Sequence, residues 1–256
     1  MKLMTTTIYE ETEKDIEYAY KSQSKSKIEK ETSYVLSQII VIMLGAFKDR
    51  LKEITFDTNY LHFNEQYILS NKNRNALLKW LKRLMLISLP TTDLEFGKLK
   101  LDLEDWYYQI SSQDISFEYR DDYLIKPKQA AELLGISNVT LNKYMKQGFE
   151  HIDTSSHNKI PKHAVDLWKD PVYCIKMQYL YQEKKRLRQT PEERLSEVYE
   201  ELMQYKKKYK TPFIKKAFEG INIDALDDPS DYYEWRDLLE EEEELTNQLI
   251  GEKDIE

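Results

Sequence analysis

The stretch YLIKPKQAAELLGISNVTLNKYMKQGFEHIDTSSHNKIPKHAVDLW, residues 123–168, decides how the middle of the chain folds. It predicts a short helix that begins at Pro127, because the first turn of a helix leaves the N–H of that position unbonded in any case. Gly135 supplies the left-handed residue with which many helices end. Between these two residues, apolar side chains recur at the spacing of one buried helix face: Ala130, Leu133 and Leu134.

A second short helix is predicted directly after this turn. Ser137 is suited to cap its N-terminus, and Gly148 ends it. The helix carries Val139, Leu141, Tyr144 and Met145, of which Val139, Leu141 and Met145 are expected to face inward. Two short helices joined by a tight turn that contains glycine form a helix-turn-helix unit, whose second helix enters the major groove of DNA.

The outward side of the second helix carries side chains that can form hydrogen bonds. We expect them to face DNA: Ser137, Asn138, Thr140, Asn142, Lys143 and Lys146. Asparagine can bind adenine through two hydrogen bonds, and lysine can contact guanine or a phosphate. The alternative is an ordinary amphipathic helix whose outer face is only solvated.

Two segments of this stretch carry a family resemblance. The segment PKQAAELLGISNVTLNKYMKQG (residues 127–148), followed by KIPKHAVDLW (residues 159–168), resembles the excisionase-like, MerR-related winged helix-turn-helix domains of bacterial DNA-binding proteins. The resemblance covers about a fifth of the chain. It implies a two-stranded wing over residues 149–160, and then a short helix over residues 163–168 with Pro161 at its first position.

The resemblance also implies which residues outside the second helix meet DNA. The wing tip would consist of Ser155, Ser156, His157 and Asn158, with His157 among the DNA-binding residues. The flanking phosphates would be met by Lys126, Lys128, Lys159 and Lys162. The tip departs from the family, whose members often carry a glycine and paired arginines there.

Composition and length predict a soluble protein of one or two domains. The chain has 256 residues, of which 33% are charged, and its mean hydropathy is −0.71. No segment approaches the roughly 18 apolar residues that a membrane span needs. The single cysteine, Cys174, excludes an internal disulfide and fits a reducing compartment, so we expect a cytoplasmic protein.

Charge is distributed unevenly along the chain. The formal net charge is −8, but residues 219–256 alone contribute −13, which leaves +5 for the remainder. Contacts with phosphates dominate affinity for nucleic acids, so the local charge matters more than the total. A basic body with an acidic tail is compatible with DNA binding.

Residues 28–120 are interpreted as an N-terminal α/β domain of unknown role. Residues 1–27 before it are interpreted as a polar leader that is frayed or partly helical. We expect helices over residues 28–51 and 71–86, and strands over residues 54–57, 61–69, 94–103 and 106–119. The region contains no phosphate-binding glycine loop, and the four histidines of the chain do not cluster at metal-ligand spacing. The carboxylates around residues 102–105 are expected on a solvated surface.

Helices are also predicted after residue 170. Thr190, Pro191 and Glu193 form a capping box at the start of one of them. Its apolar residues repeat at three and four, as in a short coiled coil: Leu195, Val198, Leu202, Tyr205 and Tyr209. Dimerisation and packing against the body of the same chain are equally compatible with this pattern.

The acidic tail carries large apolar residues, which a merely solvating tail does not need. They are expected to bind a partner: Phe213, Phe218, Tyr232, Tyr233, Trp235 and Leu238. The alternative is a C-terminal helix that docks on its own chain. The order of elements is similar to that of antitoxins that carry this DNA-binding domain. That similarity implies autorepression and a second segment that wraps a nuclease toxin.

Together these patterns predict an α+β, mainly helical fold. Its segments are a leader (1–27), an N-terminal α/β domain (28–120), a winged helix-turn-helix domain (121–170), a helical dimerisation or packing region (171–211) and an acidic tail (212–256). The predicted function is a sequence-specific double-stranded DNA-binding transcriptional regulator, homodimeric, with no catalytic residue, metal or cofactor. The antitoxin hypothesis adds a toxin protein as a partner. The alternative is an excisionase-like architectural factor for recombination or replication of a phage or plasmid.

Overall fold

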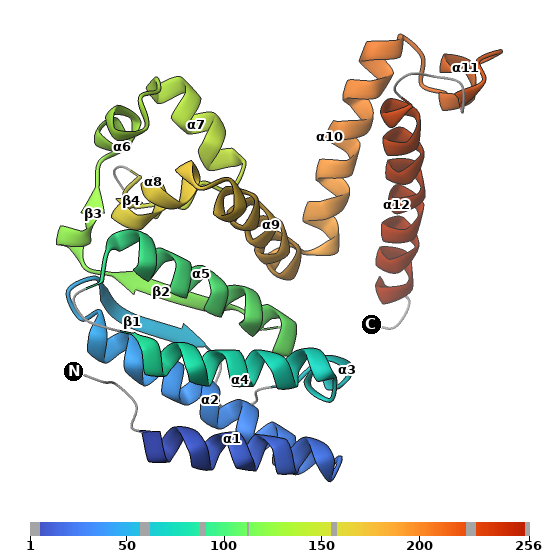
Figure 1. The fold of residues 1–256 in the computed structure, drawn as a ribbon. Coiled ribbons are helices and arrows are strands. Elements are labelled where there is room, and N and C mark those ends of the chain that lie inside the picture. Colours follow the sequence, from blue (N-terminus) through green and yellow to red (C-terminus); the bar gives the residue numbers. More distant parts are fainter. Residues whose placement is uncertain are drawn as a thin grey trace. The chain divides into compact units, whose positions relative to one another are not determined.

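The computed structural model shows a mainly helical α+β protein with two short pairs of strands (Figure 1). It describes residues 6–56, 62–87, 91–111, 113–154, 158–223 and 229–253. The chain divides into two compact units, Met1–Leu187 and Arg188–Glu256. The predicted mainly helical fold class is therefore confirmed.

Three helices form one layer of the first unit: α1 (Thr6–Lys21), α2 (Lys25–Ala46) and α4 (Asn71–Leu86) (Figure 1). The bounds of α4 are those predicted from the sequence. The leader predicted as frayed or partly helical is helical over α1, and Ile16 and Ala19 are buried against this layer. Their spacing of three residues places them on one face of α1, so a short apolar stripe is enough to fix a polar helix.

A small antiparallel sheet lies beside this layer. Strand β1 (Leu51–Phe56) pairs with β2 (Ile115–Tyr119), and Ile54 faces Phe117 in the register. The strand predicted at residues 54–57 is confirmed as far as Phe56, whereas position 57 lies outside the described residues. The strand predicted over residues 61–69 is wrong. Its described part contains helix α3 (Glu65–Ile68), which Asn64 caps by accepting a hydrogen bond from the Tyr67 N–H.

The central element of the first unit is helix α5 (Asp93–Ile110). The sequence predicted a strand over residues 94–103, and this prediction is wrong. A capping box starts the helix: the Thr92 hydroxyl accepts from the Glu95 N–H at 3.1 Å, and the Glu95 carboxylate accepts from the Thr92 N–H at 3.0 Å. The strand predicted over residues 106–119 is correct only for β2.

Helix α5 separates two hydrophobic cores. The first core includes Phe96, Leu103 and Tyr107 of α5 and the helices of the α1–α2–α4 layer. The second core takes Leu101 from α5 and unites α6 (Pro127–Leu134), α7 (Asn138–Lys146), α8 (Lys162–Lys169) and α9 (Pro171–Arg188). Figure 1 shows α5 between these two groups of helices.

The two helices predicted from residues 123–168 are present with the predicted turn. Gly135 has a φ of 67°, in the left-handed region, and the Ser137 hydroxyl accepts a hydrogen bond from the Thr140 N–H. Two side chains predicted to point inward do not, because Leu133 is 53% exposed and Val139 is 69% exposed. The buried face of α7 consists of Leu141 and Met145.

Short backbone pairings follow α7. Ile152 and Lys159 form an antiparallel bridge, and β4 (Ile160–Pro161) pairs with β3 (Leu124–Ile125), which follows the 3-10 turn η1 (Asp121–Tyr123). The predicted short helix is confirmed as α8. The sequence had placed Pro161 at the first helical position of this helix, whereas in the structure Pro161 is the N-cap.

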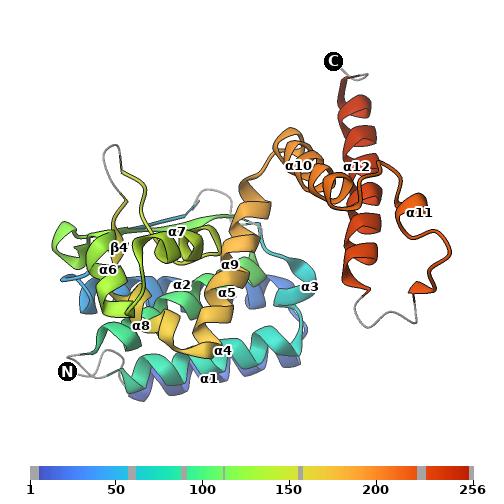
Figure 2. The same ribbon diagram turned by 90° about the horizontal axis from the view of Figure 1, so that it is seen from above.

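The second unit is a pair of helices with its own core. Helices α10 (Pro191–Tyr209) and α12 (Ser230–Lys253) lie side by side, with the short helix α11 (Ile214–Ala217) in the connection (Figure 2). The capping box predicted at Thr190 is confirmed. Val198 and Leu202 of α10 are buried against Trp235 and Leu238 of α12. The coiled-coil pattern of α10 therefore packs within the chain.

None of the helices in the described ranges combines the length and the apolar character that crossing a membrane requires.

The crossing of α5 and α8 yields a test of this fold. A Cβ atom on Gly97 would lie 2.9 Å from the Cβ of His163 and 3.0 Å from a methyl group of Leu167. We predict that Gly97→Ala destabilises the first unit by about 1–3 kcal/mol, as overpacking does. Urea unfolding followed by tryptophan fluorescence measures this change, since three of the four tryptophans lie in the first unit.

Gly45→Ala is the matched control, because a Cβ on Gly45 of α2 meets nothing within 4 Å. An alanine in a helix is favoured over glycine by up to about 1 kcal/mol, so this variant should be neutral or more stable. Equal stability of the two variants would contradict the close crossing of α5 and α8.

Candidate nucleic-acid interface

Helix α7 presents one continuous exposed face. Four exposed residues are spaced three, one and three positions apart, which places them on the same side of the helix: Val139, Asn142, Lys143 and Lys146. Asn138 is exposed next to them in the first turn. The opposite side, with Leu141 and Met145, is buried in the second core. The structure therefore brings together four of the six α7 residues that the sequence assigned to DNA.

These four polar side chains are available to a ligand. Asn138, Asn142, Lys143 and Lys146 make no side-chain hydrogen bond or ion pair with another residue in the described part of the chain. Helix α7 carries no acidic residue, although residues 121–170 as a whole hold seven lysines and seven acidic residues. The positive charge is thus local to this face and its flanks.

The remaining two α7 residues have a structural role. The Ser137 hydroxyl accepts a hydrogen bond from the Thr140 N–H at 3.1 Å, and the two hydroxyls lie 2.9 Å apart. Such a cap satisfies an N–H that the helix itself cannot bind. Ser137 and Thr140 therefore fix where α7 begins.

The lysines predicted to meet phosphates differ in their surroundings. Lys126, Lys128 and Lys162 are exposed, and Lys162 lies 5.8 Å from the ring of Tyr123. Lys159 instead donates to Asp121 at 2.6 Å, and this hydrogen bond lowers the pKa of the Asp121 carboxyl. His157 lies outside the described residues.

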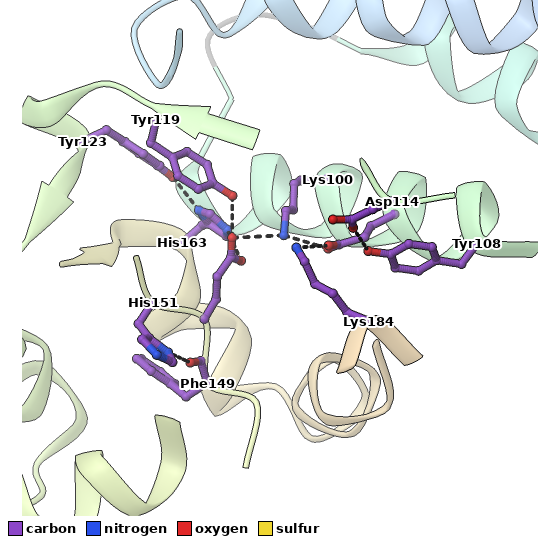
Figure 3. A network of polar contacts seen from close by, with 11 residues as sticks. Lys100, Tyr108, Asp114, Tyr119, Tyr123, Phe149, His151, His163 and Lys184 are labelled. Carbon is purple, nitrogen blue, oxygen red and sulfur yellow. Dashed lines mark hydrogen bonds and ion pairs between the residues drawn. The ribbon is translucent and has the colours of Figure 1, made fainter. Parts of the chain in front are cut away.

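A buried polar network connects the end of α7 to α5 (Figure 3). The ammonium of Lys100 lies 2.7 Å from Glu104 and 3.0 Å from Glu150, which follows Phe149 just after α7. The Tyr119 hydroxyl donates to the same Glu150 oxygen at 2.6 Å. One carboxylate thus joins α5, β2 and the segment that leaves α7.

His163 of α8 extends this network. Its side chain is 0% exposed, with Nε2 3.1 Å from Glu150 Oε2 and Nδ1 3.3 Å from the Tyr123 hydroxyl. At the other end, Lys184 of α9 lies 3.6 Å from Glu104. The network therefore links α5, β2, α8 and α9 with the segment that follows α7.

The charges in this network stabilise one another. Burial would raise the pKa of Glu150, but Lys100 and His163 outweigh it and hold that pKa well below its ordinary value. Burial alone would lower the pKa of Lys100. The negative charges of Glu104 and Glu150 outweigh burial, so the pKa of Lys100 is raised above its ordinary value. For Tyr119, burial and the Glu150 charge both raise the pKa. The lysine and Glu150 are therefore ionised and Tyr119 is neutral.

The charged members of this network are paired with one another inside the protein. The Lys100 side chain is 5% exposed, and its ammonium faces the two carboxylates. The sequence had placed the carboxylates near residue 104 on a solvated surface, which is wrong for the buried Glu104. The sequence does contain an indication of this buried pair, because Lys100 and Glu104 stand four residues apart among leucines and can form an ion pair on a helix. In the described part of the chain, no group of three or more metal-ligating side chains is placed to hold a metal ion.

The partner-binding residues predicted in the tail lie in the second unit. Trp235 and Leu238 are buried between α10 and α12, and Phe218 and Tyr232 are partly buried. Phe213 is 66% exposed and Tyr233 is exposed. Trp235 and Leu238 therefore stabilise their own helix pair and are unavailable to a partner while it is intact.

A comparison of the chain with protein-family models, with curated proteins and with solved structures found no match.

The network gives a prediction that depends on pH. Glu150→Gln should destabilise the first unit by roughly 3 kcal/mol at neutral pH, because removing one partner leaves buried charge uncompensated. The folded-state pKa of Glu150 lies below its ordinary value of 4.5. The stability that its ionised form contributes is therefore present above about pH 4.5 and is lost as the pH falls below that value. Urea unfolding of both proteins over this pH range measures the difference.

Glu118→Gln is the matched control, because Glu118 pairs with Lys52 on the surface of the β1–β2 sheet. Exposed pairs contribute at most about 1 kcal/mol, so this variant should stay close to the wild type. A stability loss for Glu150→Gln that stays constant down to acidic pH would contradict the assigned ionised state.

Proposed function

We propose that the chain is a sequence-specific double-stranded DNA-binding transcriptional regulator, with α7 as the helix that enters the major groove. The observation that carries this function is the exposed α7 face. Two asparagines and two lysines share it, none of them has a partner among the described residues, and no acidic side chain stands on the helix.

The dimensions of α7 suit this role. Its nine residues span roughly 13 Å, and the major groove of B-DNA is about 12 Å wide and admits an α-helix. In helix-turn-helix proteins the N-terminal residues of the second helix contact base edges. Asn138 and Asn142 fall in the first half of α7 and can each offer an amide to adenine.

The lysines divide into two groups by position. Lys143 and Lys146 stand on α7 itself and can reach guanine or a phosphate. Lys126, Lys128 and Lys162 lie on the flanks, where contacts with phosphates would set the register of the helix on the duplex. Only a few basic side chains in this region are placed to contact phosphates, so we expect the affinity for DNA to depend moderately on salt concentration.

The support behind α7 favours specific reading over loose attraction. Direct readout requires donors and acceptors to be held in place relative to the base edges. Leu141 and Met145 are buried in the second core, and Glu150 is tied to α5 a few residues beyond the helix. We propose double-stranded DNA as the partner of this face.

Selection of bound duplexes from a random pool tests the proposal, and the selected site then allows a mutational test. We predict that Lys143→Ala weakens binding to that site by about 1–3 kcal/mol if its ammonium contacts a base, and lowers the preference at that base pair. Titration by fluorescence anisotropy measures both effects.

The control is Lys14→Ala on α1, which removes an equal charge from an exposed lysine outside the α7 region. It should leave affinity for the selected site nearly unchanged. Enrichment of no sequence would contradict sequence-specific binding. Equal effects of the two variants on a selected site would contradict an interface on α7.

A further inference from the structure

Val139 is the one residue of the α7 face that is apolar. It occupies the second position of the helix and is 69% exposed, although burial of an aliphatic side chain is energetically favourable. Its neighbours on the same face, Asn142 and Lys143, are three and four residues further along. The core does not need Val139, because Leu141 and Met145 already fill the buried side of α7.

A branched aliphatic side chain in this position has a defined partner in the major groove. Among the base edges displayed there, the 5-methyl group of thymine is the apolar feature, and apolar side chains recognise it by contact. The asparagines beside Val139 suit adenine, which is the partner of thymine in the same base pair. An aliphatic and two amide side chains on one face are therefore complementary to A·T pairs.

We infer that Val139 reads the 5-methyl group of thymine, so that the DNA site of this chain contains A·T pairs under the first half of α7. This inference rests on the proposed function and adds the chemical class of the site. It assigns specificity to a residue that the hydrogen-bonding pattern alone would leave out.

The test replaces thymine by deoxyuridine, which keeps the base pair and lacks only the methyl group. The selected duplex is synthesised with one replacement at a time, and each duplex is titrated with the wild-type protein. Burial of one methyl-sized group corresponds to about a fourfold change in affinity. We expect a loss of about three- to fivefold at one or two thymines and no change at the others.

Val139→Ala is the paired variant, and it is suited to the experiment because alanine favours helices and the side chain supports no core. It should bind the thymine duplex about three- to fivefold more weakly than the wild type. It should also bind the thymine and deoxyuridine duplexes equally at the sensitive position. Lys143→Ala serves as the matched control, because it should weaken binding while keeping the wild-type ratio between the two duplexes.

The outcomes separate this inference from the proposed function. If no duplex is selected, the proposed function fails, and the inference fails with it. If a duplex is selected but no thymine is sensitive to replacement, DNA binding stands and the role of Val139 is refuted. That role is also refuted if Val139→Ala keeps the full sensitivity of the wild type.

Discussion

The contact between the Lys100 ammonium and the Glu150 carboxylate is the interaction on which the arrangement of the first unit depends. It joins the central helix α5 to the segment that leaves α7, inside the protein, where each charge alone would be costly to bury. Tyr119 and His163 occupy the remaining positions around Glu150. Because each ion has several partners, the network stabilises one relative placement of these elements and disfavours others.

That placement determines what α7 can do. The helix is only nine residues long, and isolated helices of this length are marginal in water, so its order comes from the packing of its buried side. The close approach of α5 and α8 at Gly97 brings His163 within reach of Glu150. The exposed side chains of α7 are thereby presented from a fixed base, which is what reading base edges requires.

The sequence predicted local structure well in several elements of which one side is buried. Helix α4 has its predicted bounds, and the turn between α6 and α7 follows from Gly135 and Ser137. Helix α5 was mistaken for a strand because it lies between two cores, so that Leu99, Leu101 and Leu103 are all buried and their alternation imitates a strand. The buried network as a whole could not be predicted, since its members come together from α5, β2, η1, α8, α9 and the segment after α7. The outward position of Val139 was missed because an aliphatic residue was assumed to face the core.

The charge distribution agrees with the division into two units. Residues 188–256 hold ten basic and twenty acidic residues, a net of −10, which leaves +2 for the first unit. Part of the acidity of the second unit is used internally, because Arg194 binds Glu241 through two contacts of 2.6 Å and Asp231 accepts from Tyr209. Its stability comes from its own core around Trp235. The acidic total of the chain therefore belongs largely to a helix pair with its own core. The proposed affinity for DNA would depend on the local charge around α7 and not on this total.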